Sequence, residues 1–327
     1  MKEVNFWKFI FNRITTGFPV ILMIVADSSK SSPGRQGFKM AVSSGGELAG
    51  TVGGGIMEHN LVEQCRGYLK DERNINQVKK LFHNKTSAGE KSGLICGGTE
   101  TIIIRTLTAD NANFISDIIS SFENLKGGIF QIDPVRISFN VTNTRGRAIF
   151  FNYESDNDWT YEENTGFPET VYIIGSGHVG LAVSKIMSML DFYVIAIDSR
   201  NDVSTVLNNT YADKKLIISY EEVGEHIIEG DKTYAVIVTH GHDTDVIALK
   251  SVIEKKLAYL GMMGSKRKIK SVFNHLVESG TEPELLDRVH SPIGLEIEAE
   301  SPEEIAVSIA AEIIKLKNRI KTGTGDH

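Results

Sequence analysis

Cysteine is scarce in this sequence, and basic residues do not outnumber acidic ones. Two cysteines in 327 residues cannot form a disulfide framework, so we expect a reducing, cytoplasmic location. A formal net charge of −7 gives no support for nucleic-acid binding. The apolar run at 20–26 is far too short to cross a bilayer and predicts a buried strand instead. Neither nucleic acid nor a membrane is therefore expected as a partner.

The first half of the chain predicts a mixed α+β domain. Residues 1–17 carry Phe6, Ile10 and Ile14 at helical spacing, which favours an amphipathic helix over a signal peptide. The acidic segment 154–170 has no periodicity and is expected to be a linker, with the domain boundary near residue 168. Between them we expect strands at 20–26, 38–44 and 47–52, a helix at 56–71, a strand after Cys96, a helix at 111–125 and a β-hairpin at 137–153.

The second half changes to strands that alternate with helices, which predicts a Rossmann-like, doubly wound parallel sheet. Residues 170–200 follow the order strand, glycine turn, helix, strand, and further strands are expected at 215–220, 234–240 and 256–264. Ser301-Pro302 with Glu304 predicts a capped start of the last helix. The fold class is therefore α/β, with a first domain at 1–168 and a Rossmann-like domain at 169–327.

A glycine fingerprint of the kind that binds dinucleotides opens this second domain. Gly175 would permit a tight turn, Gly177 would let the backbone approach a pyrophosphate, and Gly180 would let helix and strand pack closely. The alternative is a Rossmann domain that is kept for its shape and leaves the nucleotide site unused.

Polar residues near this turn extend the predicted nucleotide site. Asp198 ends the next strand and is expected to accept hydrogen bonds from ribose hydroxyls, and His178 adds a donor. Arg200 leaves open whether the ribose carries a 2′-phosphate. The ligand could be NAD(P) or another nucleotide.

A histidine- and aspartate-rich segment, "THGHDTD", follows the predicted strand at 234–240. His240, His242, Asp243 and Asp245 are similar to part of a hydrolase metal site, but the required order of ligands is broken at Thr244 and Asp245. Residues at the carboxyl end of a Rossmann strand line the ligand crevice. We therefore predict ligand-lining or helix-capping roles here, and no metal.

Several stretches together resemble one family, the xanthine dehydrogenase accessory proteins of the XdhC/CoxI type. The resemblance spans nearly the whole chain in the family's order. The stretches are "SSPGRQGFKM" (31–40), "GTVGGGIMEHNLVEQC" (50–65), "GLICGGTETIIIR" (93–105), "VYIIGSGHVG" (171–180), "VIVTHGHDTD" (236–245), "YLGMMGSKRK" (259–268) and "VHSPIGLEIEAESPEEIAVSIAAEI" (289–313).

This resemblance implies a chaperone of the molybdenum–molybdopterin cofactor rather than a turnover enzyme. Such a protein carries the cofactor, protects it while a cysteine desulfurase replaces an oxo group by sulfido, and helps insert it into an apo-xanthine dehydrogenase or a related molybdenum hydroxylase. A two-domain body, with a homodimer as the expected assembly, goes with this function. The sequence departs from the family at Lys30 and Glu298, where glycine is common, and at Glu296, which replaces aspartate.

The two ends of such a cofactor differ in chemistry, so each end needs different residues to hold it. Donors and cations suit the phosphate, a carboxylate suits the pterin edge, and a thiolate suits the molybdenum–sulfur end. Cys65 lies among apolar residues of a helix and is expected to be core. The candidates in the first domain are Arg35, Lys39, Gly53, Gly54, Gly55 and Glu58, with Cys96, Gly97 and Gly98 for the metal end; Ser265 and Lys266 are added in the second.

Two other functions remain open at this point. The complete glycine fingerprint with Asp198 also suits an NAD(P)-dependent oxidoreductase, although the first half offers no clear acid or base for hydride transfer. A metal hydrolase built on His240 and His242 is the third class. The sequence does not identify the client enzyme, the form of the pterin or the oligomeric state.

Overall fold

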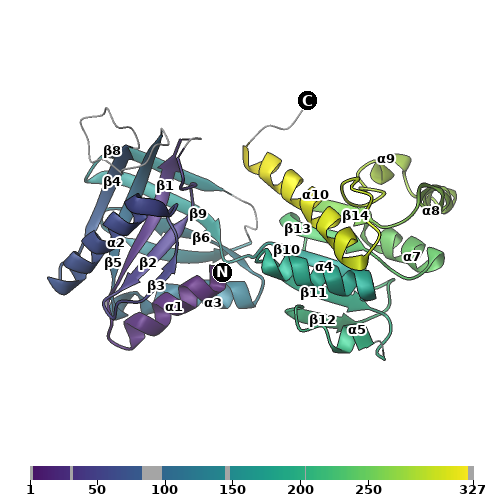
Figure 1. The fold of residues 1–327 in the computed structure, drawn as a ribbon, viewed down its shortest axis with the longest axis horizontal. Helices are drawn as coiled ribbons and strands as arrows, with labels where there is room; N and C mark the ends of the chain where they lie inside the picture. Colours follow the sequence, from purple (N-terminus) through teal and green to yellow (C-terminus); the bar gives the residue numbers. More distant parts are fainter. Residues whose placement is uncertain (1–2, 30–31, 83–97, 144–147, 203, 323–327) are drawn as a thin grey trace. The chain divides into compact units, whose positions relative to one another are not determined.

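The computed structural model describes residues 3–29, 32–82, 98–143, 148–202 and 204–322. The chain divides into two compact units, Met1–Phe167 and Pro168–His327 (Figure 1). We refer to them as unit 1 and unit 2. No helix in the described ranges is both long enough and apolar enough to cross a membrane.

Unit 1 is a mixed α+β body built on two antiparallel sheets, with strand orders β3-β2-β1-β5-β4 and β7-β6-β9-β8. Its elements are α1 (Glu3–Thr15), β1 (Val20–Ser28), β2 (Lys39–Ser43), β3 (Leu48–Gly50), α2 (Gly55–Lys70), β4 (Asn76–Phe82), β5 (Thr99–Leu107), the 3-10 turn η1 (Ala109–Asn111), α3 (Ala112–Glu123), β6 (Gly127–Ile132), β7 (Ile137–Thr142), β8 (Ile149–Ser155) and β9 (Asp158–Thr165).

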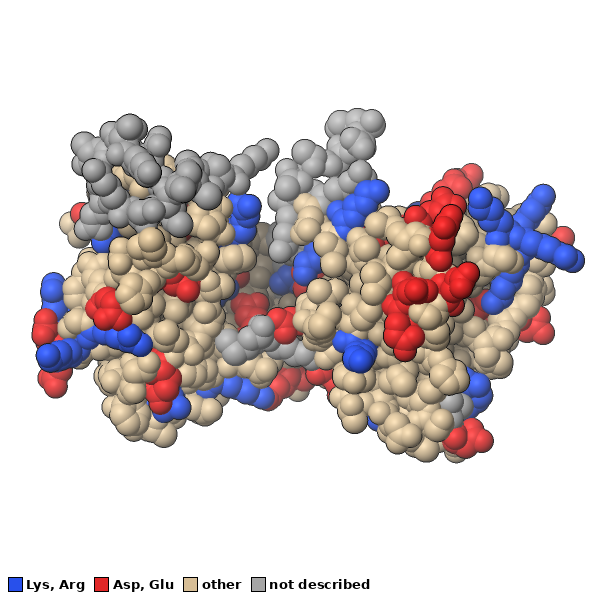
Figure 2. Space-filling model, in the orientation of Figure 1, with Lys and Arg blue, Asp and Glu red and all other residues tan. Residues whose placement is uncertain are grey.

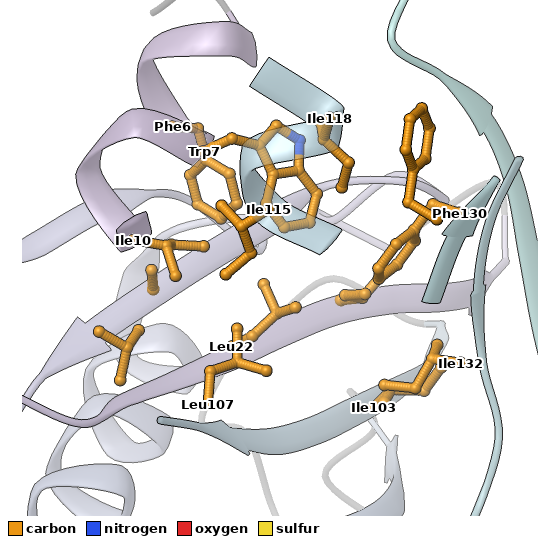
Figure 3. Close-up of a cluster of buried hydrophobic side chains, with 14 of the residues drawn as sticks. Phe6, Trp7, Ile10, Leu22, Ile103, Leu107, Ile115, Ile118, Phe130 and Ile132 are labelled. Carbon is orange, nitrogen blue, oxygen red and sulfur yellow. The ribbon is translucent and has the colours of Figure 1, made fainter. Parts of the chain in front are cut away.

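Strand β1 is buried on both faces, which explains its unbroken apolar run. Leu22 and Ile24 face the cluster drawn in Figure 3, where side chains from α1, α3 and β6 meet the sheet. Met23 and Val25 face a second cluster that α2 covers. Successive side chains of a strand point to opposite faces, so a strand between two apolar layers shows no alternation. The predicted helix, with Phe6, Ile10 and Ile14 buried, is confirmed as α1.

The predicted β-hairpin at 137–153 is wrong. Strand β7 pairs with β6 and strand β8 pairs with β9, so β7 and β8 lie at opposite edges of the second sheet. The real hairpin into β7 turns at Asp133, whose carboxylate accepts the backbone N–H groups of Val135 and Arg136 at 2.7 Å. An aspartate before a proline is a turn signal, and here it outweighed the apolar pattern of the two strands.

The predicted linker at 154–170 is wrong as well, because it contains β9. Along this strand Trp159, Tyr161, Glu163 and Thr165 are buried at alternate positions. The buried carboxylate of Glu163 pairs with Lys39 Nζ at 2.8 Å. A strand can bury a carboxylate only where a partner neutralises it, and the partner here comes from the distant strand β2.

Unit 2 is the expected Rossmann-like domain, a parallel sheet with strand order β12-β11-β10-β13-β14. Its elements are β10 (Thr170–Ile174), α4 (His178–Met189), β11 (Tyr193–Asp198), α5 (Ser204–Leu207), β12 (Lys214–Ile217), α6 (Val223–His226), β13 (Gly230–Ile237), α7 (His242–Val252), β14 (Leu257–Met262), α8 (Lys266–Glu278), α9 (Pro283–Leu286) and α10 (Pro302–Thr322).

Helices α4 and α10 pack together over one face of this sheet, where Val171 and Ile173 of β10 are buried against them. Helix α7 packs against β13. The predicted start of the last helix is confirmed: Glu304 Oε2 accepts the N–H of Ser301 at 2.9 Å, and the N–H of Glu304 donates to Ser301 Oγ at 3.3 Å.

On the face drawn in Figure 2, basic side chains lie dispersed among acidic ones.

Candidate functional site

Three of the segments that resemble the family meet at one end of the first sheet of unit 1. The loop after β1 is tied to the start of β5 by the N–H of Ser29, which donates to the carbonyl of Thr99 at 2.9 Å. The N–H of Gly34 donates to Glu100 Oε1 at 2.7 Å, and Glu100 is fully buried. A Cβ at Gly53 would lie 2.6 Å from the nitrogen of Gly34, so the turn before α2 packs directly on this loop.

We call Gly34, Gly53 and Glu100 the glycine–glutamate cluster. Glycine is required at both positions, because a Cβ at Gly34 would lie 2.4 Å from the carbonyl oxygen of Val52. Glu100 is not among the residues that the sequence motifs predict. Its signal is a lone carboxylate at the head of a strand of β-branched residues, since a charge in that setting needs a local partner.

Glu58, four residues after Gly54, turns back toward the glycine turn. Its Oε2 accepts the hydroxyl of Thr51 at 2.5 Å, the N–H of Val52 at 2.8 Å and the N–H of Gly54 at 3.1 Å. The N–H of Gly53 donates to Thr51 Oγ1. The carboxylate therefore occupies the place where an external phosphate would bind, and the phosphate role of Gly53, Gly54 and Gly55 stays a prediction that requires Glu58 to move.

The two predicted cations of unit 1 lie in different surroundings. Arg35 Nη1 donates to the carbonyl of Ser32 at 3.1 Å, within the loop that carries Gly34. Lys39 is buried, and its Nζ lies 2.8 Å from Glu163 and 3.3 Å from Glu3. Burial alone would lower the pKa of Lys39, but the two carboxylates raise it above the ordinary value. Lys39 can contact phosphate only if this ion cluster opens.

The cysteine predictions divide between two regions. Cys96 and Gly97 lie outside the described residues, as does Lys30; Gly98 is described and directly precedes β5. Cys65 is fully buried in α2, with its Sγ 3.7 Å from Met23 Sδ. Burial raises the pKa of the Cys65 thiol to about 12, so this cysteine is an inert core residue, as predicted.

In unit 2 the three fingerprint glycines have distinct surroundings. A Cβ at Gly175 would lie 2.5 Å from the carbonyl oxygen of Val238, and one at Gly180 would lie 2.1 Å from the carbonyl oxygen of Gly175. A Cβ at Gly177 would meet nothing within 4 Å. Two glycines are therefore needed for packing inside the protein, whereas Gly177 borders open space at the start of α4, where His178 is exposed.

Asp198 lies beside this turn but is already fully engaged. Its carboxylate accepts the N–H of Ser176 at 2.8 Å and pairs with the guanidinium of Arg200, and the side chain is fully buried. Burial alone would raise the pKa of Asp198, but the hydrogen bonds from Arg200 and Ser176 outweigh it and lower the pKa. The predicted contact with ribose hydroxyls stays a prediction.

The other predicted contacts of unit 2 lie at the start of α8. Ser265 caps this helix by accepting the N–H of Lys268 at 3.3 Å. Lys266 is exposed and lines a pocket of about 470 Å³ together with Ile269, Lys270, Phe273, Asn274, Ser291 and Pro292. Glu298, which replaces a common glycine, has a φ of 55°, a left-handed conformation that glycine adopts without strain. Its side chain is exposed.

The candidate metal ligands of the segment "THGHDTD" do not lie together. Asp245 is buried, where Thr239 donates to it and Lys268 forms an ion pair with it. His242 Nε2 lies 3.0 Å from Ser271 Oγ, on the exposed side of α7. Among the described residues no group of at least three His, Cys, Asp or Glu side chains is placed to hold a metal ion. Sequence analysis predicted no metal and missed the Asp245–Lys268 pair.

Comparison with known proteins gives matches in both units. The model of the XdhC and CoxI family matches residues 14–79, and the model of the XdhC Rossmann domain matches residues 171–313. The segment 93–105 lies between the two matched ranges.

Two curated relatives match parts of this chain. An uncharacterized protein of Escherichia coli (strain K12), YqeB, is 24% identical over 310 residues, which cover 93% of this chain and 45% of that protein. A probable xanthine dehydrogenase subunit from Bacillus subtilis (strain 168) is 30% identical over 148 residues, 45% of this chain and 43% of that protein. The chain thus spans less than half the length of these curated relatives.

A solved structure shares the fold of the whole chain. The crystal structure of a xanthine dehydrogenase from Bacillus halodurans covers 99% of this chain and 98% of its own, with a TM-score of 0.73 and 19% identity. With one family model matching each unit, and with this fold, the chain belongs to the XdhC and CoxI family.

Proposed function

We propose that this chain is an accessory protein of a xanthine dehydrogenase-type molybdenum hydroxylase and that it binds the molybdenum–pterin cofactor as its cargo. Membership of the XdhC and CoxI family supports this proposal, as does the name of the Bacillus subtilis relative. The chain would hold the cofactor while a cysteine desulfurase supplies sulfur, and then transfer it to the apo-hydroxylase. A homodimeric assembly belongs to the same proposal.

The observation that carries the proposal is the glycine–glutamate cluster of unit 1. It joins the loop at Gly34, the turn at Gly53 and the head of β5 at Glu100, which come from three stretches that resemble the family. Residues far apart in sequence are brought together at one strand end, where loops held by a sheet commonly form binding sites.

Cys96, Arg35 and Glu100 each have a definite part in the proposal. Cys96 lies two residues before Gly98, and a thiolate suits a soft molybdenum–sulfur centre. Arg35 supplies a cation and fixed donors for the anionic end of the cargo. Glu100 contacts no cargo; it positions the loop by accepting the N–H of Gly34.

Unit 2 is proposed to bind a nucleotide at the turn Gly175–Gly180. The open space at Gly177 and the first N–H groups of α4, which have no intrahelical acceptors, support this part. The same features keep an NAD(P)-dependent oxidoreductase as the second candidate function. Steady turnover of NAD(P)H with a small substrate, without any client enzyme, would favour that candidate.

The test of the proposed function is activation of apo-xanthine dehydrogenase by the full chain, supplied with cofactor and desulfurase. Cys96→Ser keeps the side-chain volume almost unchanged, so we expect it to fold normally and to lose client activation. Cys65→Ser is the matched control, because it places a hydroxyl in the buried cluster beside Met23. We expect Cys65→Ser to melt at a lower temperature and to activate the client normally once folded. If Cys96→Ser activates as well as the wild type, the role of Cys96 is excluded.

A further inference from the structure

The carboxylate of Asp198 has no capacity left for a ribose. Its Oδ1 accepts the backbone N–H of Arg200 at 3.1 Å and Arg200 Nε at 2.9 Å. Its Oδ2 accepts the N–H of Ser176 at 2.8 Å and Arg200 Nη2 at 3.0 Å. Each carboxylate oxygen offers two lone pairs, so all of its acceptor sites are filled. The side chain is also fully buried.

The groups that reach solvent at the end of β11 are therefore those of the next residues, Ser199 and Arg200. Ser199 is exposed, and the side chain of Arg200 is 36% exposed. A guanidinium has five N–H donors and no acceptor. Nε and Nη2 each donate once to Asp198, which leaves the other N–H groups of Arg200 to bind a ligand.

This arrangement suits a phosphate better than a diol. A ribose diol is held best by an acceptor such as a carboxylate, and the carboxylate here is buried and saturated. A fixed guanidinium offers donors with the geometry that a phosphate accepts. Because Asp198 holds the guanidinium in one orientation, little side-chain entropy is lost when a phosphate binds.

We propose that unit 2 selects a nucleotide whose ribose carries a phosphate group, of the NADP(H) class, and that Arg200 determines this choice. The inference rests on the proposed nucleotide site at Gly175–Gly180. The hydrogen bond from Ser176 to Asp198 links that turn to the end of β11, so the two parts of the site are held together.

Two carboxylates near Arg200 oppose the phosphate: Asp198, whose charge balances that of the guanidinium, and Asp202. Asp202 is exposed and lies close enough to Arg200 to stabilise the guanidinium charge. In water this carboxylate is well screened, so its effect on a bound phosphate is small. Asp202→Asn should tighten the binding of NADPH slightly and leave NADH unchanged.

The experiment titrates the full chain with NADPH and NADH, and with 2′-phospho-AMP and AMP, by calorimetry. We expect the phosphorylated member of each pair to bind about 10- to 100-fold tighter, as charge-assisted hydrogen bonds to one phosphate allow. Arg200→Ala should remove this preference, and Lys250→Ala, which deletes an exposed cation of α7, should keep it.

A second variant covers the case in which Arg200→Ala fails to fold after losing the partner of a buried carboxylate. Ser199→Asp leaves the Asp198–Arg200 pair intact and adds an exposed negative charge at the residue next to Arg200. It should weaken NADPH binding and spare NADH. If wild-type protein binds NADH as tightly as NADPH, the inference is overturned and the nucleotide site stands. If neither dinucleotide binds, the nucleotide site and the inference are both wrong.

Discussion

The two units each contain a glycine turn before a helix, and the two turns differ in what fills them. In unit 1 the N–H groups of Val52 and Gly54 donate to the carboxylate of Glu58, the fourth residue of α2. In unit 2 the fourth residue of α4 is Leu181, and the space beside Gly177 is open. In unit 1 the carboxylate of Glu58 accepts donors of the turn, whereas in unit 2 Asp198 accepts the N–H of Ser176 and Leu181 offers no acceptor to the first N–H groups of α4. A Cβ would meet nothing within 4 Å at Gly54 as well as at Gly177, so the difference lies in the acceptor and not in the open space.

A glycine turn is therefore not by itself an anion site. The turn and the helix start supply donors in both units, but a carboxylate one helical turn further on satisfies them internally in unit 1. The side chain that follows the glycines therefore decides the chemistry. For this reason we propose the nucleotide for unit 2 and the metal–pterin cargo for unit 1.

The largest expected effect sharpens the comparison within unit 2. Gly180→Ala would place a Cβ 2.1 Å from the backbone oxygen of Gly175, which forces the backbone to move. We expect unit 2 to lose about 1 to 3 kcal/mol of stability from this overpacking. Gly177→Ala has no such conflict and should unfold like the wild type. Urea titration of both variants measures the difference; equal stabilities would mean that the two glycines do not have separate roles.

The second prediction concerns the ligand that the open turn would take. Gly177→Ala places a methyl group where the pyrophosphate is expected, so nucleotide affinity should fall by at least about tenfold. Calorimetric titration of the folded variant with NADPH provides the measurement. Unchanged affinity would show that the nucleotide does not contact this turn.

The third prediction concerns a variant that frees the donors of the turn in unit 1. Glu58→Ala removes the acceptor of three donors and should cost roughly 1 to 2 kcal/mol of stability. Sulfate should then bind the freed N–H groups and raise the melting temperature of the variant more than chloride does at equal ionic strength. Glu63→Ala, an exposed position of the same helix, is the control. A variant that sulfate stabilises no more than the wild type would contradict the idea of a self-filled turn.

The smallest expected effect is a pH dependence in unit 2. The pKa of Asp198 is lower in the folded state than its ordinary value of 3.8. Its contribution to stability is therefore present above pH 3.8 and is lost as the pH falls through the lower, folded-state pKa. Asp198→Asn should flatten this part of the stability profile, measured by denaturant unfolding at several acidic pH values. An unchanged profile would mean that other carboxylates carry the acid sensitivity.

Much of the fold follows from the sequence because local patterns agree with the tertiary structure. In unit 2 strands and helices alternate from Thr170 onward, as the local sequence pattern predicts. The capped start of α10 needs only Ser301 and Glu304. Strand β9 was missed because its inward Glu163 is neutralised by Lys39, a residue more than a hundred positions away. A partner so distant in the sequence cannot be recognised from the hydrophobic pattern around Glu163.

The candidate site was predictable to a similar degree. The spacing of Glu58 indicates its return to the glycine turn, because both lie within one helical turn. The buried role of Glu100 and the saturation of Asp198 depend on contacts across strands and on the side chain of Arg200. Motif analysis assigns residue types to positions, but it does not tell which of their hydrogen-bonding groups are already used.

The central claim is that the chain carries a molybdenum–pterin cofactor for a client hydroxylase. The most direct test is to purify the full chain from cells with an active cofactor pathway and to measure its pterin, by fluorescence after oxidation, together with its molybdenum, by elemental analysis. We predict stoichiometric pterin and molybdenum on the wild type and a clear loss of molybdenum in Cys96→Ser, while Cys65→Ser keeps both. Wild-type protein that holds neither pterin nor molybdenum, although the hydroxylase in the same cells is loaded, would contradict the account.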